Sequence, residues 1–177
     1  MDYNMLATTD QLSVSQACSE LWMGLRAAGD PEPRVNRSRI KGLIVARTSM
    51  DPVEAIRGLR AYLASDPERL GSVYRVMPVQ MWAETSVERV VDAVKTLAGV
   101  MGPVDSFRVT LEKRRTQLRS LEVIDAVASA IELRVDLEQP DWVVLVEVVG
   151  DETGVSVVRP RDILNVQKER AALSPER

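Results

Sequence analysis

Hydrophobic residues recur along the chain at two different spacings, and each spacing predicts a type of element. Between residues 10 and 29 they recur every three or four positions, which is typical of a helix with one buried face; these positions are Val14, Ala17, Cys18, Leu21, Leu25 and Ala28. The sequences Asp51-Pro52-Val53-Glu54 and Thr85-Ser86-Val87-Glu88 each combine a capping side chain with a nearby glutamate. They predict two further helices, over 51–65 and 85–98.

Strands are predicted where apolar and polar residues alternate, or where a short apolar run stands between turn residues. The predicted strands are 43–46, 73–77, 107–111, 142–149 and 155–158. Ser120 to Ile131 is predicted to be helical, and Asp162 begins a short final helix. Residues 1–9 show neither spacing, so we expect them to fray. Helices alternating with strands predict an α/β or α+β fold with a mixed sheet, flanking helices and a domain boundary near residue 84.

The composition is that of a soluble globular protein. Apolar residues make up 45% and charged residues 28% of the 177 residues, and no apolar run approaches the roughly 20 residues that span a bilayer. The start of the chain does not have the pattern of a signal peptide. One cysteine, Cys18, excludes an internal disulfide and suits a reducing compartment. We therefore expect a cytoplasmic protein that does not contact a membrane.

The formal net charge of −3 is unevenly distributed, and arginine supplies most of the positive charge. One basic stretch contains Arg26, Arg34, Arg37, Arg39, Lys41 and Arg47, and a second contains Arg108, Lys113, Arg114, Arg115 and Arg119. The planar guanidinium group suits phosphate recognition. A GC-rich genome or a heat-adapted surface is the more ordinary cause of an arginine excess, so the bias alone does not indicate a ligand.

The residue inventory excludes several classes of enzyme. The chain has no histidine, which rules out a Ser-His-Asp triad, a Cys-His pair and a histidine-ligated zinc ion. One cysteine cannot form a thiolate metal site, and neither the nucleotide P-loop nor the dinucleotide-binding fingerprint is present. The adjacent carboxylates Asp151 and Glu152 stand beside Gly154 in a predicted turn, where a solvated hairpin explains them better. We predict no catalytic residue, no cofactor and no metal.

The basic run Lys113-Arg114-Arg115 ends a predicted strand, and a predicted helix begins at Ser120. Cations beside the free N–H groups of a helix N-terminus form a common phosphate-binding arrangement. A short basic run is more often a solvated turn, so further cations are needed. Arg159 and Arg161 would supply them if their strand lies beside the first, and Asn165 and Lys168 would then project from the last helix near the same edge.

The segment from Thr85 to Arg170 resembles a THUMP domain, the RNA-binding module found beside thiouridine synthases, RNA methyltransferases and pseudouridine synthases. Five sequence segments carry the resemblance. The first three are the capped helix from Thr85, Phe107-Arg108-Val109-Thr110 with Lys113-Arg114-Arg115, and Ser120-Leu121-Glu122-Val123. The other two are Val135-Asp136-Leu137-Glu138-Gln139-Pro140-Asp141 and the hairpin from Val146-Glu147-Val148 to Gly154-Val155-Ser156-Val157-Val158. The ending Arg161-Asp162-Ile163-Leu164-Asn165-Val166-Gln167-Lys168 is similar to that of stand-alone adaptors for cytidine N4-acetylation in tRNA.

The resemblance implies a division into an N-terminal helix and linker (1–35), a small ferredoxin-like domain (36–84) and a THUMP-like RNA-binding domain (85–177). It also implies an adaptor, not itself an enzyme, that binds the acceptor end of tRNA and acts with a separate RNA acetyltransferase or other RNA-modifying enzyme. The expected RNA-binding residues are Lys113, Arg114, Arg115, Arg119, Arg159, Arg161, Asn165 and Lys168. A structural or protein-interaction module without RNA is the alternative, and an RNA-modifying enzyme in its own right is the third.

Overall fold

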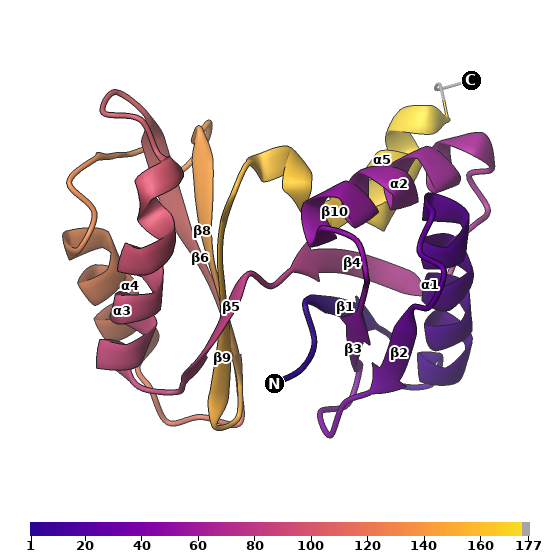
Figure 1. Cartoon of the computed structure of the whole chain (residues 1–177), viewed down its shortest axis with the longest axis horizontal. Coiled ribbons are helices and arrows are strands. Elements are labelled where there is room, and N and C mark those ends of the chain that lie inside the picture. The colour runs from indigo at the N-terminus through magenta and orange to yellow at the C-terminus, as the bar shows by residue number, and fades with distance from the viewer. Residues whose placement is uncertain (175–177) are drawn as a thin grey trace. The chain divides into compact units, whose positions relative to one another are not determined.

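The computed structural model describes residues 1–174 and separates into two compact units. One unit contains residues 79–160 together with Met1, and the other contains Asp2–Pro78 together with the segment from Arg161 onward (Figure 1). This division differs from the predicted one. Two separate segments, residues 2–78 and the segment from Arg161 onward, form one unit, whereas the prediction placed residues 85–177 in a single domain. Residues 175–177 of that range lie outside the described residues.

The unit of residues 2–78 and 161 onward is built on an antiparallel sheet with the order β10 (Leu164–Asn165), β4 (Val73–Pro78), β1 (Met5–Thr9), β3 (Leu43–Arg47) and β2 (Arg34–Arg37). Its helices are α1 (Val14–Ala28), α2 (Pro52–Ser65) and α5 (Val166–Leu173), and a short 3₁₀ turn, η2 (Pro160–Asp162), precedes β10. The order of elements from β1 to β4 is strand-helix-strand-strand-helix-strand, which is the ferredoxin-like arrangement. That arrangement therefore spans residues 5–78 and includes α1, which was predicted to lie outside it.

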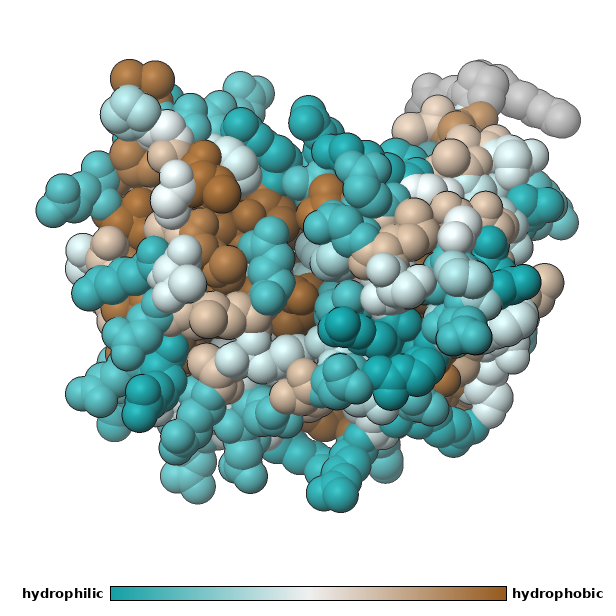
Figure 2. Space-filling model, in the orientation of Figure 1, coloured by the Kyte–Doolittle hydropathy of each residue, from teal (hydrophilic) through white to brown (hydrophobic). Residues whose placement is uncertain are grey.

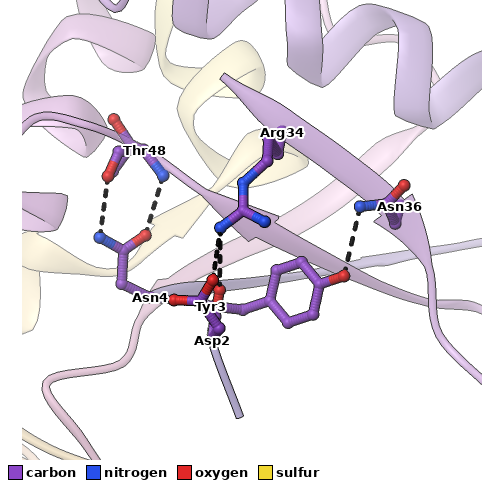
Figure 3. Close-up of polar contacts among 6 residues, drawn as sticks. All are labelled: Asp2, Tyr3, Asn4, Arg34, Asn36 and Thr48. Carbon is purple, nitrogen blue, oxygen red and sulfur yellow. Dashed lines mark hydrogen bonds and ion pairs between the residues drawn. The ribbon is translucent and has the colours of Figure 1, made fainter. Parts of the chain in front are cut away.

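The prediction that residues 1–9 fray is wrong, because β1 is the middle strand of this sheet. Met5, Leu6 and Ala7 are fully buried. A strand that is buried on both faces has no alternation of apolar and polar residues, so its sequence gave no periodic signal. The residues before β1 are also fixed, through polar contacts among Asp2, Tyr3, Asn4, Arg34, Asn36 and Thr48 (Figure 3).

Two helices, α1 and α2, pack against the same core and approach each other closely. The core contains Leu21 and Leu25 of α1 and Ile56 and Leu59 of α2, all fully buried. Asp51 caps α2 as its sequence predicted, since its carboxylate accepts hydrogen bonds from the N–H groups at 53 and 54 at 2.9 and 3.2 Å. The final segment then joins this unit, where Leu164 lies opposite Val76 of β4.

The unit of residues 79–160 has a mixed sheet with the order β5 (Met81–Glu84), β9 (Glu152–Val158), β8 (Trp142–Val149), β6 (Ser106–Arg114) and β7 (Arg134–Val135). β6 runs parallel to β8 and β7, and β9 runs antiparallel to β8 and β5. The helices α3 (Val87–Leu97) and α4 (Ser120–Ser129) cover one face, and the 3₁₀ turn η1 (Ala98–Val100) follows α3 (Figure 1). The predicted mixed α/β fold is confirmed. None of the helices in residues 1–174 has the length and apolar character of a membrane span.

Candidate nucleic-acid interface

The predicted basic run lies where β6 leaves the sheet and turns toward α4. Lys113 and Arg114 are the last residues of β6, and α4 begins at Ser120. The ammonium group of Lys113 donates a hydrogen bond to the Leu118 carbonyl at 2.8 Å, so it lies beside the turn that leads into the helix. Lys113, Arg115 and Arg119 are all exposed. The predicted combination of strand-end cations and a helix N-terminus is therefore present in this connection.

The first turn of α4 has no side-chain cap. Its N-cap residue is Arg119, which has an extended backbone, and no side-chain hydrogen bond caps the helix there. The N–H groups of a first turn have no partner within the helix, so in this connection they can bind an anion. Glu122 also stands in the first turn and partly neutralises the positive end of the helix.

Arg114 has a different environment from the other cations of the run. Its guanidinium group pairs with Glu147 of β8 at 2.7 Å, and their side chains are 16% and 1% exposed. A buried carboxylate needs a cation or several hydrogen bonds to remain charged, because burial removes its hydration. Arg114 therefore neutralises Glu147 within the sheet, a role that the sequence did not predict.

Arg115 continues the chain beyond the strand in a left-handed conformation, with φ of 53°. Few residues other than glycine adopt this region, and here it turns the chain away from the sheet at the point where β6 ends. The N–H of Gly150, in the turn between β8 and β9, donates to the Arg114 carbonyl at 2.9 Å. These two features fix the direction in which the basic connection leaves the sheet.

Arg159 lies at the opposite end of this sheet from Lys113. β8 separates β9 from β6, and Val143, at the beginning of β8, pairs with Val158, at the end of β9. Lys113 of β6 pairs with Val148, and Arg159 follows Val158, so the two cations are separated by about six residues of strand, roughly 20 Å. Arg159 would have joined the basic run only if its strand lay beside β6, and β8 lies between them, so the two are not grouped.

The Arg159 guanidinium group instead packs 3.7 Å from the centre of the Trp142 ring and donates to the Asp141 carbonyl at 3.2 Å. The Trp142 indole donates to the Asp105 carboxylate at 2.8 Å. That bond, together with one from the Gly102 N–H, lowers the pKa of Asp105. Arg159 thus takes part in a polar cluster at this end of the sheet.

The remaining three predicted residues belong to the other unit. Arg161 lies in η2 and its side chain is exposed, while its carbonyl accepts a hydrogen bond from Arg60 at 2.6 Å. The Asn165 side chain caps α5 by accepting from the Lys168 N–H at 3.1 Å, which gives it a structural role. Lys168 itself is exposed. The eight residues therefore form three separate groups, and the β6–α4 connection contains four of them.

The prediction of site residues did not include the other basic stretch. Residues 34–47 form the hairpin of β2 and β3, whose cations are Arg34, Arg37, Arg39, Lys41 and Arg47, all exposed. The signal was visible in the sequence, because residues 33–50 contain no carboxylate.

A protein-family model described as the THUMP domain matches residues 84–158. The match falls within the unit of residues 79–160 and includes the whole β6–α4 connection. The chain therefore contains a THUMP domain, as its sequence predicted.

Solved structures share the fold over most of the chain. PH1313 from Pyrococcus horikoshii Ot3 has a TM-score of 0.61 at 17% identity, and TrmN from Thermus thermophilus has a TM-score of 0.57 at 23% identity. A 4-thiouridine synthetase in complex with RNA and ATP has a TM-score of 0.50 at 15% identity. Each comparison covers 89% of this chain but only 55%, 46% and 42% of the respective protein, so the chain spans about half their length. No curated protein sequence matches the chain.

Proposed function

We propose that this chain is an RNA-binding adaptor, without catalytic activity of its own, that presents tRNA to a separate RNA-modifying enzyme. The proposed modification is N4-acetylcytidine, the proposed contact is the acceptor end of the tRNA, and the proposed location is the cytoplasm. The observation that carries the proposal is the THUMP domain at residues 84–158, whose β6–α4 connection displays exposed cations beside an uncapped helix N-terminus. The shared fold with TrmN and with a 4-thiouridine synthetase–RNA complex supports it.

In this proposal, Lys113, Arg115 and Arg119 hold backbone phosphates at the start of α4. Contacts of this kind fix the register of an RNA and carry little sequence information. Arg114 contributes by keeping β6 and β8 together through Glu147. Three other predicted contacts do not belong to this group of cations. Arg159 lies at the other end of the sheet, and Arg161 and Lys168 belong to the other unit, so their contact with RNA stays a prediction.

The direct test is the tRNA of cells that lack the gene. We expect N4-acetylcytidine to disappear from digested tRNA, as measured by mass spectrometry, and to return when the wild-type chain is supplied. A Lys113→Glu/Arg119→Glu variant should not restore it. The matched control is Arg89→Glu/Lys95→Glu, which makes the same change of charge at exposed positions on α3. Unchanged N4-acetylcytidine in the deletion strain would overturn the assigned modification.

A protein-interaction module is the second candidate, and a group of exposed apolar residues favours it. Val104, Leu137 and Val135 are 85%, 71% and 52% exposed, near the end of the sheet where β6 begins and β7 lies. Figure 2 shows that hydrophobic side chains also gather over the part of this unit that contains α3. Surfaces of this kind often bind proteins. Failure of the purified chain to bind tRNA even at low salt would favour this candidate.

A further inference from the structure

The hairpin of β2 and β3 forms a strongly basic surface outside the THUMP domain. Its five cations are exposed, and they are Arg34, Arg37, Arg39, Lys41 and Arg47. Figure 2 shows strongly hydrophilic side chains over β2 and β3. β2 is the last strand at its side of the sheet in the described residues, and it carries Arg34 and Arg37. Arg39 and Lys41 lie in the loop that follows, and Arg47 ends β3.

The cations stand on a rigid support. Val35 packs against the core of this unit, and the Arg37 guanidinium group donates to the hydroxyl of Ser15 on α1. The loop between the strands is held by the Thr9 N–H, which donates to the Gly42 carbonyl at 3.0 Å. Side chains on a fixed hairpin lose less freedom when they bind than side chains on a mobile loop.

Contacts with the N-terminal segment hold one side of the hairpin (Figure 3). Arg34 pairs with Asp2 at 2.7 Å, and the Asn36 amide donates to the Tyr3 hydroxyl at 3.3 Å. The hydrogen bond and ion pair with Arg34 lower the pKa of Asp2, so this carboxylate is charged at neutral pH and balances one of the five cations. The other four are also exposed.

The local charge balance favours the hairpin over the β6–α4 connection. Five cations of the hairpin are bordered by four carboxylates, Asp2, Asp10, Asp30 and Glu32. Four cations of the β6–α4 connection, Lys113, Arg114, Arg115 and Arg119, are bordered by five carboxylates, Glu112, Glu122, Glu147, Asp151 and Glu152. Charges are screened over about 8 Å at physiological salt, so the potential felt by a phosphate follows this local balance rather than the net charge of the chain.

We propose that the β2–β3 hairpin is an RNA-backbone-binding surface and that it supplies more of the phosphate contacts than the THUMP domain's own basic connection. This rests on the proposed function, which makes RNA the ligand. Arg37, Lys41 and Arg47 bind phosphates along the edge of the sheet, and Asn36 adds a polar contact. The THUMP connection then positions the RNA, while the hairpin provides most of the salt-dependent affinity.

A basic edge strand has another established use, because charge at a sheet edge prevents pairing with a second chain. Substitution of the hairpin cations by glutamate separates the two roles. Glutamate keeps the edge charged, so a purely protective role predicts an unchanged monomer and unchanged RNA affinity. A phosphate-binding role predicts a monomer with weakened RNA affinity.

The test compares three double variants of the full chain, each of which lowers the net charge by four, from −3 to −7. They are Lys41→Glu/Arg47→Glu on the hairpin, Lys113→Glu/Arg119→Glu on the THUMP connection, and Arg89→Glu/Lys95→Glu on α3 as the control; all six residues are exposed. Binding to unfractionated tRNA is measured by fluorescence anisotropy across a salt series, and sedimentation reports the oligomeric state.

For the wild-type chain, the logarithm of the binding constant should fall steeply with the logarithm of salt concentration. The hairpin variant should lose about 1.5 from the magnitude of this slope, because each phosphate contact contributes about 0.7 to 0.9. It should also bind at least about tenfold more weakly than the control at low salt. The loss in the THUMP-connection variant should be smaller.

Two results would overturn the inference while leaving the proposed function in place. One is a larger loss of affinity in the THUMP-connection variant than in the hairpin variant. The other is a hairpin variant that binds as tightly as the α3 control. If the wild-type chain itself does not bind tRNA at low salt, RNA binding as a whole is rejected, and both proposals fail.

Discussion

At the scale of single residues, the pair of Arg114 and Glu147 determines how the basic run can be tested. An Arg114→Met substitution would leave a buried carboxylate without its cation, and removing one partner of a buried pair costs about 3 to 5 kcal/mol. We expect a clear fall in the urea midpoint of unfolding. Lys113→Met, at an exposed position, should change the stability by less than about 0.5 kcal/mol.

The double variant Arg114→Met/Glu147→Leu completes this prediction. Replacing both members of a buried pair by apolar residues is often neutral or stabilising, so the double variant should recover most of the stability lost by Arg114→Met alone. If Arg114→Met is as stable as the wild type, the pair does not hold Glu147 in the sheet. Loss of RNA binding in an Arg114 variant therefore reports on phosphate contact only where stability is unchanged.

At the scale of secondary-structure elements, the crossing of α1 and α2 depends on a glycine. A Cβ atom added at Gly58 would lie 2.5 Å from the Cβ of Ala28 and 3.1 Å from its Cα. Alanine favours a helix over glycine by about 1 kcal/mol, but overpacking a core costs about 1 to 3 kcal/mol. Since the contact includes backbone, we expect overpacking to prevail and Gly58→Ala to lower the thermal midpoint.

Two further variants separate packing from helix propensity. Ala28→Gly in combination with Gly58→Ala removes the 2.5 Å contact and leaves the 3.1 Å contact with Cα, so it should restore much of the midpoint. Gly99→Ala, at a position with no heavy atom within 4 Å of the added Cβ, should be neutral or slightly stabilising. A Gly58→Ala variant that melts higher than the wild type would show that the two helices separate easily.

Elements with local signals were predicted well from the sequence, and those that depend on tertiary context were not. The capped helices α2 and α3 begin within two residues of the predicted positions, because a cap involves neighbours in the chain. β1 was missed because both its faces are buried, and β2 because its exposed polar residues read as a linker. The same limit applies to the site. Lys113 and the start of α4 are close in sequence, so their proximity could be predicted. The position of Arg159 depends on the order of the strands in the sheet, which the sequence does not reveal.

At the scale of the whole molecule, the return of the chain to the unit of residues 2–78 could not be predicted from periodicity. β10 is only two residues long, too short for an alternating pattern. Its partner and the contacts of α5 are more than 80 residues away in sequence. Arg170 donates to the carbonyls of Pro67 and Arg69 at 2.6 and 2.9 Å, and Arg60 pairs with Glu169 at 2.9 Å.

This arrangement predicts that the C-terminal segment stabilises the N-terminal unit rather than the THUMP domain. Leu164 is fully buried opposite Val76, and a buried Leu→Ala substitution costs about 2 to 5 kcal/mol. In Leu164→Ala, hydrogen exchange should accelerate in β4 and α2 and stay unchanged in β6 and β8. Leu173→Ala, at a residue that is 39% exposed, is the control and should leave both regions unchanged. Faster exchange in β6 and β8 alone would assign the segment to the THUMP domain, as the sequence first suggested. A response confined to β4 and α2 would mean that the THUMP domain is inserted within a ferredoxin-like unit whose stability depends on the returning segment from Arg161 to Ser174.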